Sequence, residues 1–145
     1  MLVLDKWTAN NDGRQAIFRR AKGQRKFHAE FIDQGYCFNA GEWTFSDSAL
    51  RGVFANAVVY AGITGWADFD PVLSRAERAS ASDLWRCAAG LPQEWYDGDR
   101  SGLERLMEQL YRRRMIIRDL IAEFRRSSRN PFPVWDKEAM AARGR

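Results

Sequence analysis

The chain has 145 residues, enough for one domain and too few for two ordinary ones. Apolar residues make up 46% and charged residues 29%, which is the balance of a globular protein rather than of a disordered or fibrous one. The 23 basic and 19 acidic residues leave a net charge of +4, so small an excess that we do not expect nucleic acid as the main partner.

Composition also excludes a structural zinc site and a membrane span. Cys37 and Cys87 are 50 positions apart, and with a single histidine they cannot supply the four ligands that structural zinc needs. The longest run without charge, residues 52–67, has 16 residues, whereas a spanning helix needs about 20. The first residues lack the apolar stretch of a signal peptide. We therefore expect a cytoplasmic protein.

The first third of the chain is predicted to form strands and loops. Residues 27–31 alternate between apolar and polar side chains, and a glycine-bearing turn at 21–24 separates them from another short run at 15–20. This pattern predicts a β-hairpin over residues 14–33 with one face packed inward.

Residues 46–128 show the spacing of helices. We expect one helix from Ser46 or Asp47 to about Gly62, and shorter ones from the capping-box patterns at Ser74 and Ser80. A further short helix is expected to start at Pro92, because proline is favoured in a first helical turn.

The strongest helical pattern begins at Ser101 and ends before Pro131. Arg114 interrupts it, which predicts a break or a buried pair there, and the arginine runs at 112–114 and 125–126 are interpreted as a solvated face. Residues 129–135 are expected to form an extended tail with anchoring aromatics, and 136–145 to be disordered. The predicted core stripe of this helix is Leu103, Leu106, Met107, Leu110, Ile117, Leu120, Ile121 and Phe124. The prediction is one domain, 1–135, mainly α with a small N-terminal β-hairpin.

Two acidic residues mark the ends of the predicted hairpin. Asp12 lies in a polar loop just before it, and Asp33 lies at its end, followed by Gly35. A hairpin brings its two ends together, so the two carboxylates are expected side by side. Magnesium is held by one or two carboxylates together with substrate phosphates, so this arrangement indicates a site for a hard cation.

These residues resemble the catalytic centre of HipA-like bacterial serine/threonine kinases. Asn10-Asn11-Asp12-Gly13-Arg14 is similar to the N-x-D-R catalytic loop of that family with a glycine inserted, and Asp33-Gln34-Gly35 is similar to the kinase D-F-G motif. The resemblance covers nearly the whole chain. It extends to the helical lobe through residues 42–45, 50–53, 66–71, 92–95 and 127–135.

The resemblance implies a protein-kinase-like C-terminal lobe that transfers the γ-phosphate of ATP to a protein serine or threonine. Asp12 would be the catalytic base and Arg14 would orient the catalytic loop. Asn11 and Gln15 would contact the cofactor, and Asp33, with Gln15, would bind Mg²⁺. The family also implies a toxin–antitoxin setting with an antitoxin-type partner.

The sequence departs from the family pattern in two ways. Where the family has an asparagine for a second magnesium, this chain has Ile17, or Phe18 if the inserted glycine is counted. Residues 1–145 also contain no glycine-rich loop and no strand lysine of a nucleotide-binding lobe. The chain is therefore expected to be incomplete or inactive by itself, as a fragment or as half of a split kinase, and to need a partner lobe.

Two other interpretations stay open. The chain could be a non-catalytic kinase-like module that binds protein. Less favoured is a basic nucleic-acid-binding domain that uses the cations of the hairpin, which are Arg19, Arg20, Lys22, Arg25 and Lys26.

Overall fold

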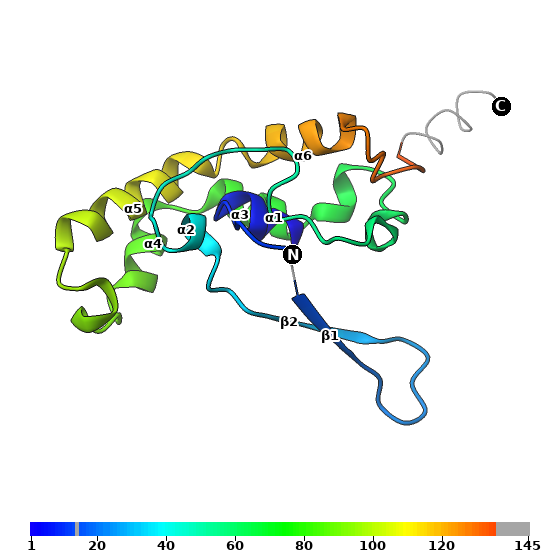
Figure 1. Cartoon of the computed structure of the whole chain (residues 1–145), viewed down its shortest axis with the longest axis horizontal. Coiled ribbons are helices and arrows are strands. Elements are labelled where there is room, and N and C mark those ends of the chain that lie inside the picture. Colours follow the sequence, from blue (N-terminus) through cyan, green and yellow to red (C-terminus); the bar gives the residue numbers. More distant parts are fainter. Residues whose placement is uncertain (14, 136–145) are drawn as a thin grey trace.

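The computed structural model describes residues 1–13 and 15–135, and it confirms a mainly helical chain with one small antiparallel sheet. The helices form an elongated body, and the hairpin projects from it (Figure 1). Among the described residues, no helix combines the length and the apolar character needed to cross a bilayer. In chain order the elements are α1 (Leu2–Trp7), β1 (Gln15–Arg19), β2 (His28–Ile32), α2 (Cys37–Ala40), the 3-10 turns η1 (Ala57–Tyr60) and η2 (Trp66–Phe69), α3 (Val72–Arg78), α4 (Ala81–Ala88), η3 (Gln93–Tyr96), α5 (Arg100–Arg113) and α6 (Ile117–Arg126).

The hairpin forms as predicted. Gln15 pairs with Ile32 and Arg19 pairs with His28, which fixes the register of all five residue pairs between β1 and β2. The predicted inward packing is incomplete, because Phe18 and Phe31 remain 52% and 43% exposed. A two-stranded hairpin is marginally stable alone, so its base needs support from the helical body.

The core stripe predicted over residues 103–124 is buried along its whole length. The predicted break is also present, since α5 ends at Arg113 and α6 begins at Ile117. The α5 half of the stripe packs with Ala88 of α4, whereas the α6 half packs with α1, α3 and the tail. Burial of one such side chain contributes roughly 1.5–3 kcal/mol, so these helices hold the body together.

The tail after α6 is anchored by aromatic side chains, as predicted. Phe132 and Trp135 are 4% and 7% exposed. The Phe132 ring meets Phe124 edge to face at 5.5 Å between centroids, and it meets Tyr60 at 6.1 Å. The tail therefore closes one end of the core. The prediction for residues 136–145 lies outside the described residues.

The helix predicted from 46 or 47 to 62 is wrong, because the 3-10 turn η1 is the only helical element in this segment. The Lys6 ammonium takes the carbonyls of Ser48, Ala49 and Arg51 as acceptors, at 3.4, 2.7 and 2.7 Å. Those carbonyls would otherwise accept the helical hydrogen bonds. Gly52 then adopts a positive φ of 67°, which ends any helical path.

Three predicted helix starts have different outcomes. The capping box at Ser80 is confirmed, with Asp83 bonded back to the Ser80 amide. The predicted start at Ser74 is two residues late, because α3 begins at Val72 and Asp70 accepts from the Ser74 amide. The cap of α5 is Asp99 rather than Ser101, since its carboxylate accepts from the Gly102 amide at 2.8 Å.

Candidate functional site

The hairpin brings its two ends together, as the sequence predicts. The amide of Asn11 donates to the carbonyl of Tyr36 at 2.9 Å. Across the same junction, the side-chain amide of Gln15 donates to Oδ2 of Asp33 at 3.2 Å. The loop that carries Asp12 therefore lies against the turn that carries Asp33. We refer to residues 11–13, 15 and 33–36 as the hairpin base.

Asp12 is exposed in a loop that is fixed from below by buried polar residues. Asn10, which is 2% exposed, donates its side-chain amide to Asp5 at 3.1 Å, and its Oδ1 accepts from the Asp12 amide at 3.1 Å. The amide of Gly13 donates to Oδ1 of Asp12 at 2.6 Å. The Asp12 carboxylate is thus held open to solvent on an ordered main chain.

Asp33 lies at a sharp turn after β2. Its φ of 56° is in the left-handed region, which aspartate tolerates better than most residues because its carboxylate can bond locally. That local bond is present, since the Gly35 amide donates to Oδ1 of Asp33 at 3.3 Å. The turn directs the chain toward Tyr36 and the contact with Asn11.

The remaining predicted site residues have different positions. Gln15 is at the start of β1 and contacts Asp33, whereas Ile17 lies two residues further along the strand, opposite Glu30 and 39% exposed. Ile17 offers no ligand atom, so Gln15 is the polar β1 side chain at the hairpin base. Arg14 lies outside the described residues, and its orienting role stays a prediction.

A groove of about 450 Å³ opens beside Asp12. One wall is the loop 11–13, and the other is the segment 48–55, which joins it through the close approach of Gly52. A Cβ on Gly52 would lie 2.9 Å from Cβ of Asp5 and 3.1 Å from the carbonyl oxygen of Asn10. Only glycine fits there, so the groove is built on a tight contact between segments far apart in the sequence. Arg51 and Arg129 also line it.

Lys6 holds the second wall in place. The residue is only 2% exposed. Its ammonium donates to three carbonyls of the segment 48–51 and lies 5.4 Å from the Phe124 ring centroid. Burial lowers the pKa of Lys6 to about 8, against the raising effects of Asp5, Asp47 and Glu123. The segment after the hairpin is thus tied to α1, directly below the Asp12 loop.

Arg113 is a buried positioning residue, and its predicted place on a solvated face is wrong. Only 7% of its side chain is exposed, and it pairs with both oxygens of Asp47 at 2.7 and 2.9 Å. It also donates to the carbonyls of Lys6 and Trp7 at 2.9 and 2.8 Å, which fixes the end of α1 just before the Asp12 loop. The sequence spacing could have indicated this burial. Arg113 is three residues after Leu110 and four before Ile117, which places it on the same helix face as these two core residues.

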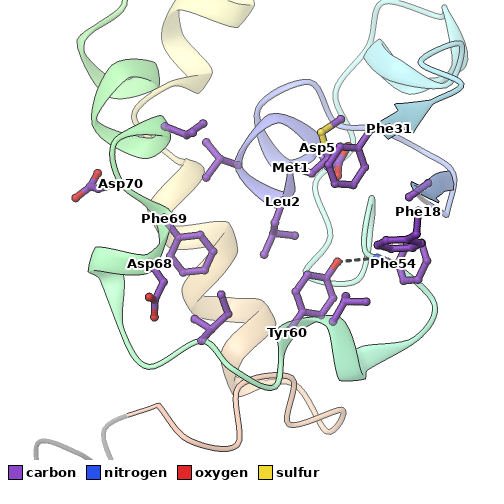
Figure 2. Close-up of a pocket in the computed structure, with 15 residues that line it drawn as sticks. Met1, Leu2, Asp5, Phe18, Phe31, Phe54, Tyr60, Asp68, Phe69 and Asp70 are labelled. Atoms are coloured by element: carbon purple, nitrogen blue, oxygen red, sulfur yellow. Dashed lines mark hydrogen bonds between the residues drawn. The ribbon is translucent and has the colours of Figure 1, made fainter. Parts of the chain in front are cut away.

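An apolar pocket of about 300 Å³ lies on the other side of the hairpin's attachment to the body. Figure 2 shows Phe18 and Phe31 of the hairpin near Phe54, with Met1 beside them. The hydroxyl of Tyr60 accepts from the Phe54 amide at 2.7 Å, which fixes the floor of this pocket. The partial exposure of Phe18 and Phe31 follows from this opening, because the hairpin stands over the body without closing onto it.

The hairpin base carries Asp12 and Asp33 on two segments that are joined by the Asn11–Tyr36 and Gln15–Asp33 hydrogen bonds. For the predicted cation site, Asp12 and Asp33 would supply carboxylates, and Gln15 would supply its carbonyl oxygen after a half-turn of its amide, which now presents nitrogen to Asp33. One or two carboxylates with phosphate oxygens is the usual protein site for magnesium. In the described part of the chain, no group of three or more His, Cys, Asp or Glu side chains could hold a metal ion.

Comparisons with models of protein families, with curated proteins and with solved structures each give no match.

Proposed function

We propose that this chain is the catalytic C-terminal lobe of a HipA-like kinase, which transfers the γ-phosphate of ATP to a serine or threonine of a protein. The closed hairpin base carries the proposal. Two hydrogen bonds, from Asn11 to Tyr36 and from Gln15 to Asp33, hold one aspartate loop against the other. A loop carboxylate beside a metal-binding carboxylate is the arrangement that protein kinases use for phosphoryl transfer.

Asp12 would accept the proton of the substrate hydroxyl. Its Oδ1 accepts from the Gly13 amide, and Oδ2 would accept the proton. The hydroxyl oxygen would then form the new bond to the γ-phosphorus, while the bond from that phosphorus to the leaving ADP oxygen breaks. The groove beside Asp12 has room for the substrate side chain that brings this hydroxyl. General base catalysis of this kind contributes roughly 10²–10⁴ in rate.

Asp33 would hold Mg²⁺, with Gln15 as a further ligand and Asn11 contacting the nucleotide. When bound, Mg²⁺ neutralises the charge on the β- and γ-phosphates. Arg14, by its place in the sequence motif, would orient the Asp12 loop. The protein part of this catalysis is mainly positioning, which is the task of the bonds among Asn10, Asp12, Gln15 and Asp33.

The proposal is tested by supplying the other half of the active site. Residues 1–145 alone should show no transfer of ³²P from ATP, because they contain no glycine-rich loop to position phosphates. Transfer to protein should appear when a nucleotide-binding lobe of a HipA-like kinase is joined in cis or added as a second chain. Robust activity of residues 1–145 alone would contradict the requirement for a second lobe.

A non-catalytic kinase-like module that binds protein is the second candidate. Ile17 favours it, because an apolar side chain stands near the expected position of the second metal ligand. The apolar pocket beside the hairpin also favours protein contact. Three residues that line it, Phe18, Phe31 and Val72, are 43–52% exposed. If the two-lobe protein stays inactive and Ile17→Asn restores transfer, the chain is a pseudokinase that lost its second metal ligand.

A further inference from the structure

The net charge of the protein is located in the hairpin. Residues 15–32 contain five basic residues and one acidic residue, for a net charge of +4. The rest of the chain contains 18 basic and 18 acidic residues and is neutral. The whole excess of positive charge therefore belongs to one element, which the composition of the full chain does not reveal.

The fold presents this charge away from the body. The hairpin projects from the helices, with its connecting loop, residues 20–27, at the far end (Figure 1). We call these eight residues the hairpin tip. Glu30 pairs with Arg19 at 3.0 Å, below the tip. In the described part of the chain, no ion pair engages the four tip cations, which are Arg20, Lys22, Arg25 and Lys26.

Several helical arginines behave differently. Arg86, Arg100 and Arg112 each pair with an acidic residue three or four positions away on the same helix. Their charge is compensated locally, whereas that of the tip cations is not. The tip therefore presents an uncompensated positive potential to solvent, and its complement is a negatively charged partner.

An aromatic side chain lies among the tip cations. Phe27 is 61% exposed, and the guanidinium of Arg20 lies 5.1 Å from the centroid of its ring. Exposed aromatic rings beside cations are typical of surfaces that bind single strands, where bases stack on rings and cations contact phosphates. A duplex is a poorer complement, because its bases are stacked on one another and are not free to stack on Phe27.

We propose that the hairpin tip binds single-stranded nucleic acid, with the four cations on successive phosphates and a base stacked on Phe27. The binding would depend little on base sequence and be similar for RNA and DNA, because phosphate contacts and base stacking provide most of its free energy. This site is distinct from the hairpin base, so it does not depend on the proposed kinase activity.

Fluorescence anisotropy of labelled (dT)20 and (U)20, titrated with residues 1–145, tests this proposal. Four phosphate contacts on a single strand predict a slope of about −2.8 for log K against log salt, hence about 50-fold weaker binding at 200 mM than at 50 mM salt. The variant Lys22→Ala/Arg25→Ala/Lys26→Ala should reduce this slope by about 2. Phe27→Ala should weaken binding by roughly fivefold or more.

A control variant separates the tip from net charge. Arg86→Ala/Arg105→Ala/Arg112→Ala removes the same three charges from α4 and α5 and should leave the affinity within about twofold. Circular dichroism of both triple variants should match the parent, because all six side chains are exposed. The proposal is overturned by absent binding at 50 mM salt, by equal losses in the two triple variants, or by tighter binding of a 20-base-pair duplex.

Discussion

Replacement of Arg113 by methionine tests whether the buried arginine positions the Asp12 loop. Methionine keeps an unbranched apolar stem, which can stay against Phe45, whose ring centroid lies 4.4 Å from the guanidinium. The substitution removes both bonds to Asp47 and leaves the carbonyls of Lys6 and Trp7 without this donor. The loss therefore falls on polar groups rather than on packing.

The magnitude follows from how deeply each group is buried. Breaking a fully buried ion pair by removing one partner costs about 3–5 kcal/mol. The Asp47 side chain is 35% exposed, so water recovers part of its solvation, and we expect about 2–4 kcal/mol for Arg113→Met. The adjacent Arg112 provides the control, because its pair with Glu108 is exposed and Arg112→Met should cost about 0.5 kcal/mol or less.

Urea unfolding followed by tryptophan fluorescence measures both variants. With a slope of about 2 kcal/mol per molar urea, the middle of the usual range, Arg113→Met should lower the midpoint by roughly 1–2 M. Arg112→Met should leave the midpoint nearly unchanged. Equal midpoints for these two variants would refute the buried clamp. In a double-mutant cycle with Asp47→Ala, the combined loss should be smaller than the sum of the single losses by about 1 kcal/mol or more.

Three further predictions concern the support of the site and the core. Gly52→Ala should destabilise the fold by about 2 kcal/mol or more in urea unfolding, because Gly52 has a positive φ and a Cβ there would lie 2.9 Å from α1. Gly62→Ala is the control and should change the midpoint little, because a Cβ on Gly62 would meet no atom within 4 Å. Leu110→Ala and Leu120→Ala should each cost about 2–5 kcal/mol, and a negligible loss would mean that α5 and α6 are peripheral. Because burial lowers the pKa of Lys6 to about 8, the folded state releases its proton before the unfolded state does. The free energy of unfolding should therefore rise between pH 8 and 9.5, by up to about 2 kcal/mol, and a Lys6→Met variant should lack this rise.

The elements that the sequence predicted well are those fixed by neighbours in the chain. The hairpin follows from alternation and a turn within 20 residues, and the stripe of α5 and α6 follows from helical spacing. The hairpin base was predictable for the same reason, because a hairpin joins its own ends. These patterns depend only on residues that are close in the sequence.

The errors arise where distant residues compete for the same groups. The residues 46–62 have helical spacing, but Lys6 takes their carbonyls from more than 40 positions away. Arg113 and Arg112 are adjacent and chemically identical, yet only Arg113 meets Asp47, 66 positions earlier in the chain. The groove beside Asp12 was not predictable either, because its second wall and Arg129 come from outside the hairpin.

The central claim is the proposal that Asp12 and Asp33 act together in phosphoryl transfer. Its most direct test is the rate of ³²P transfer to protein when this chain is combined with the nucleotide-binding lobe of a HipA-like kinase. Asp12→Asn and Asp33→Asn each keep the size of the side chain and should lower the rate by at least about 100-fold. Asp97→Asn, in the exposed turn after η3, should keep the parent rate. Transfer that persists in either the Asp12→Asn or the Asp33→Asn variant would contradict the assignment of that carboxylate to the active site.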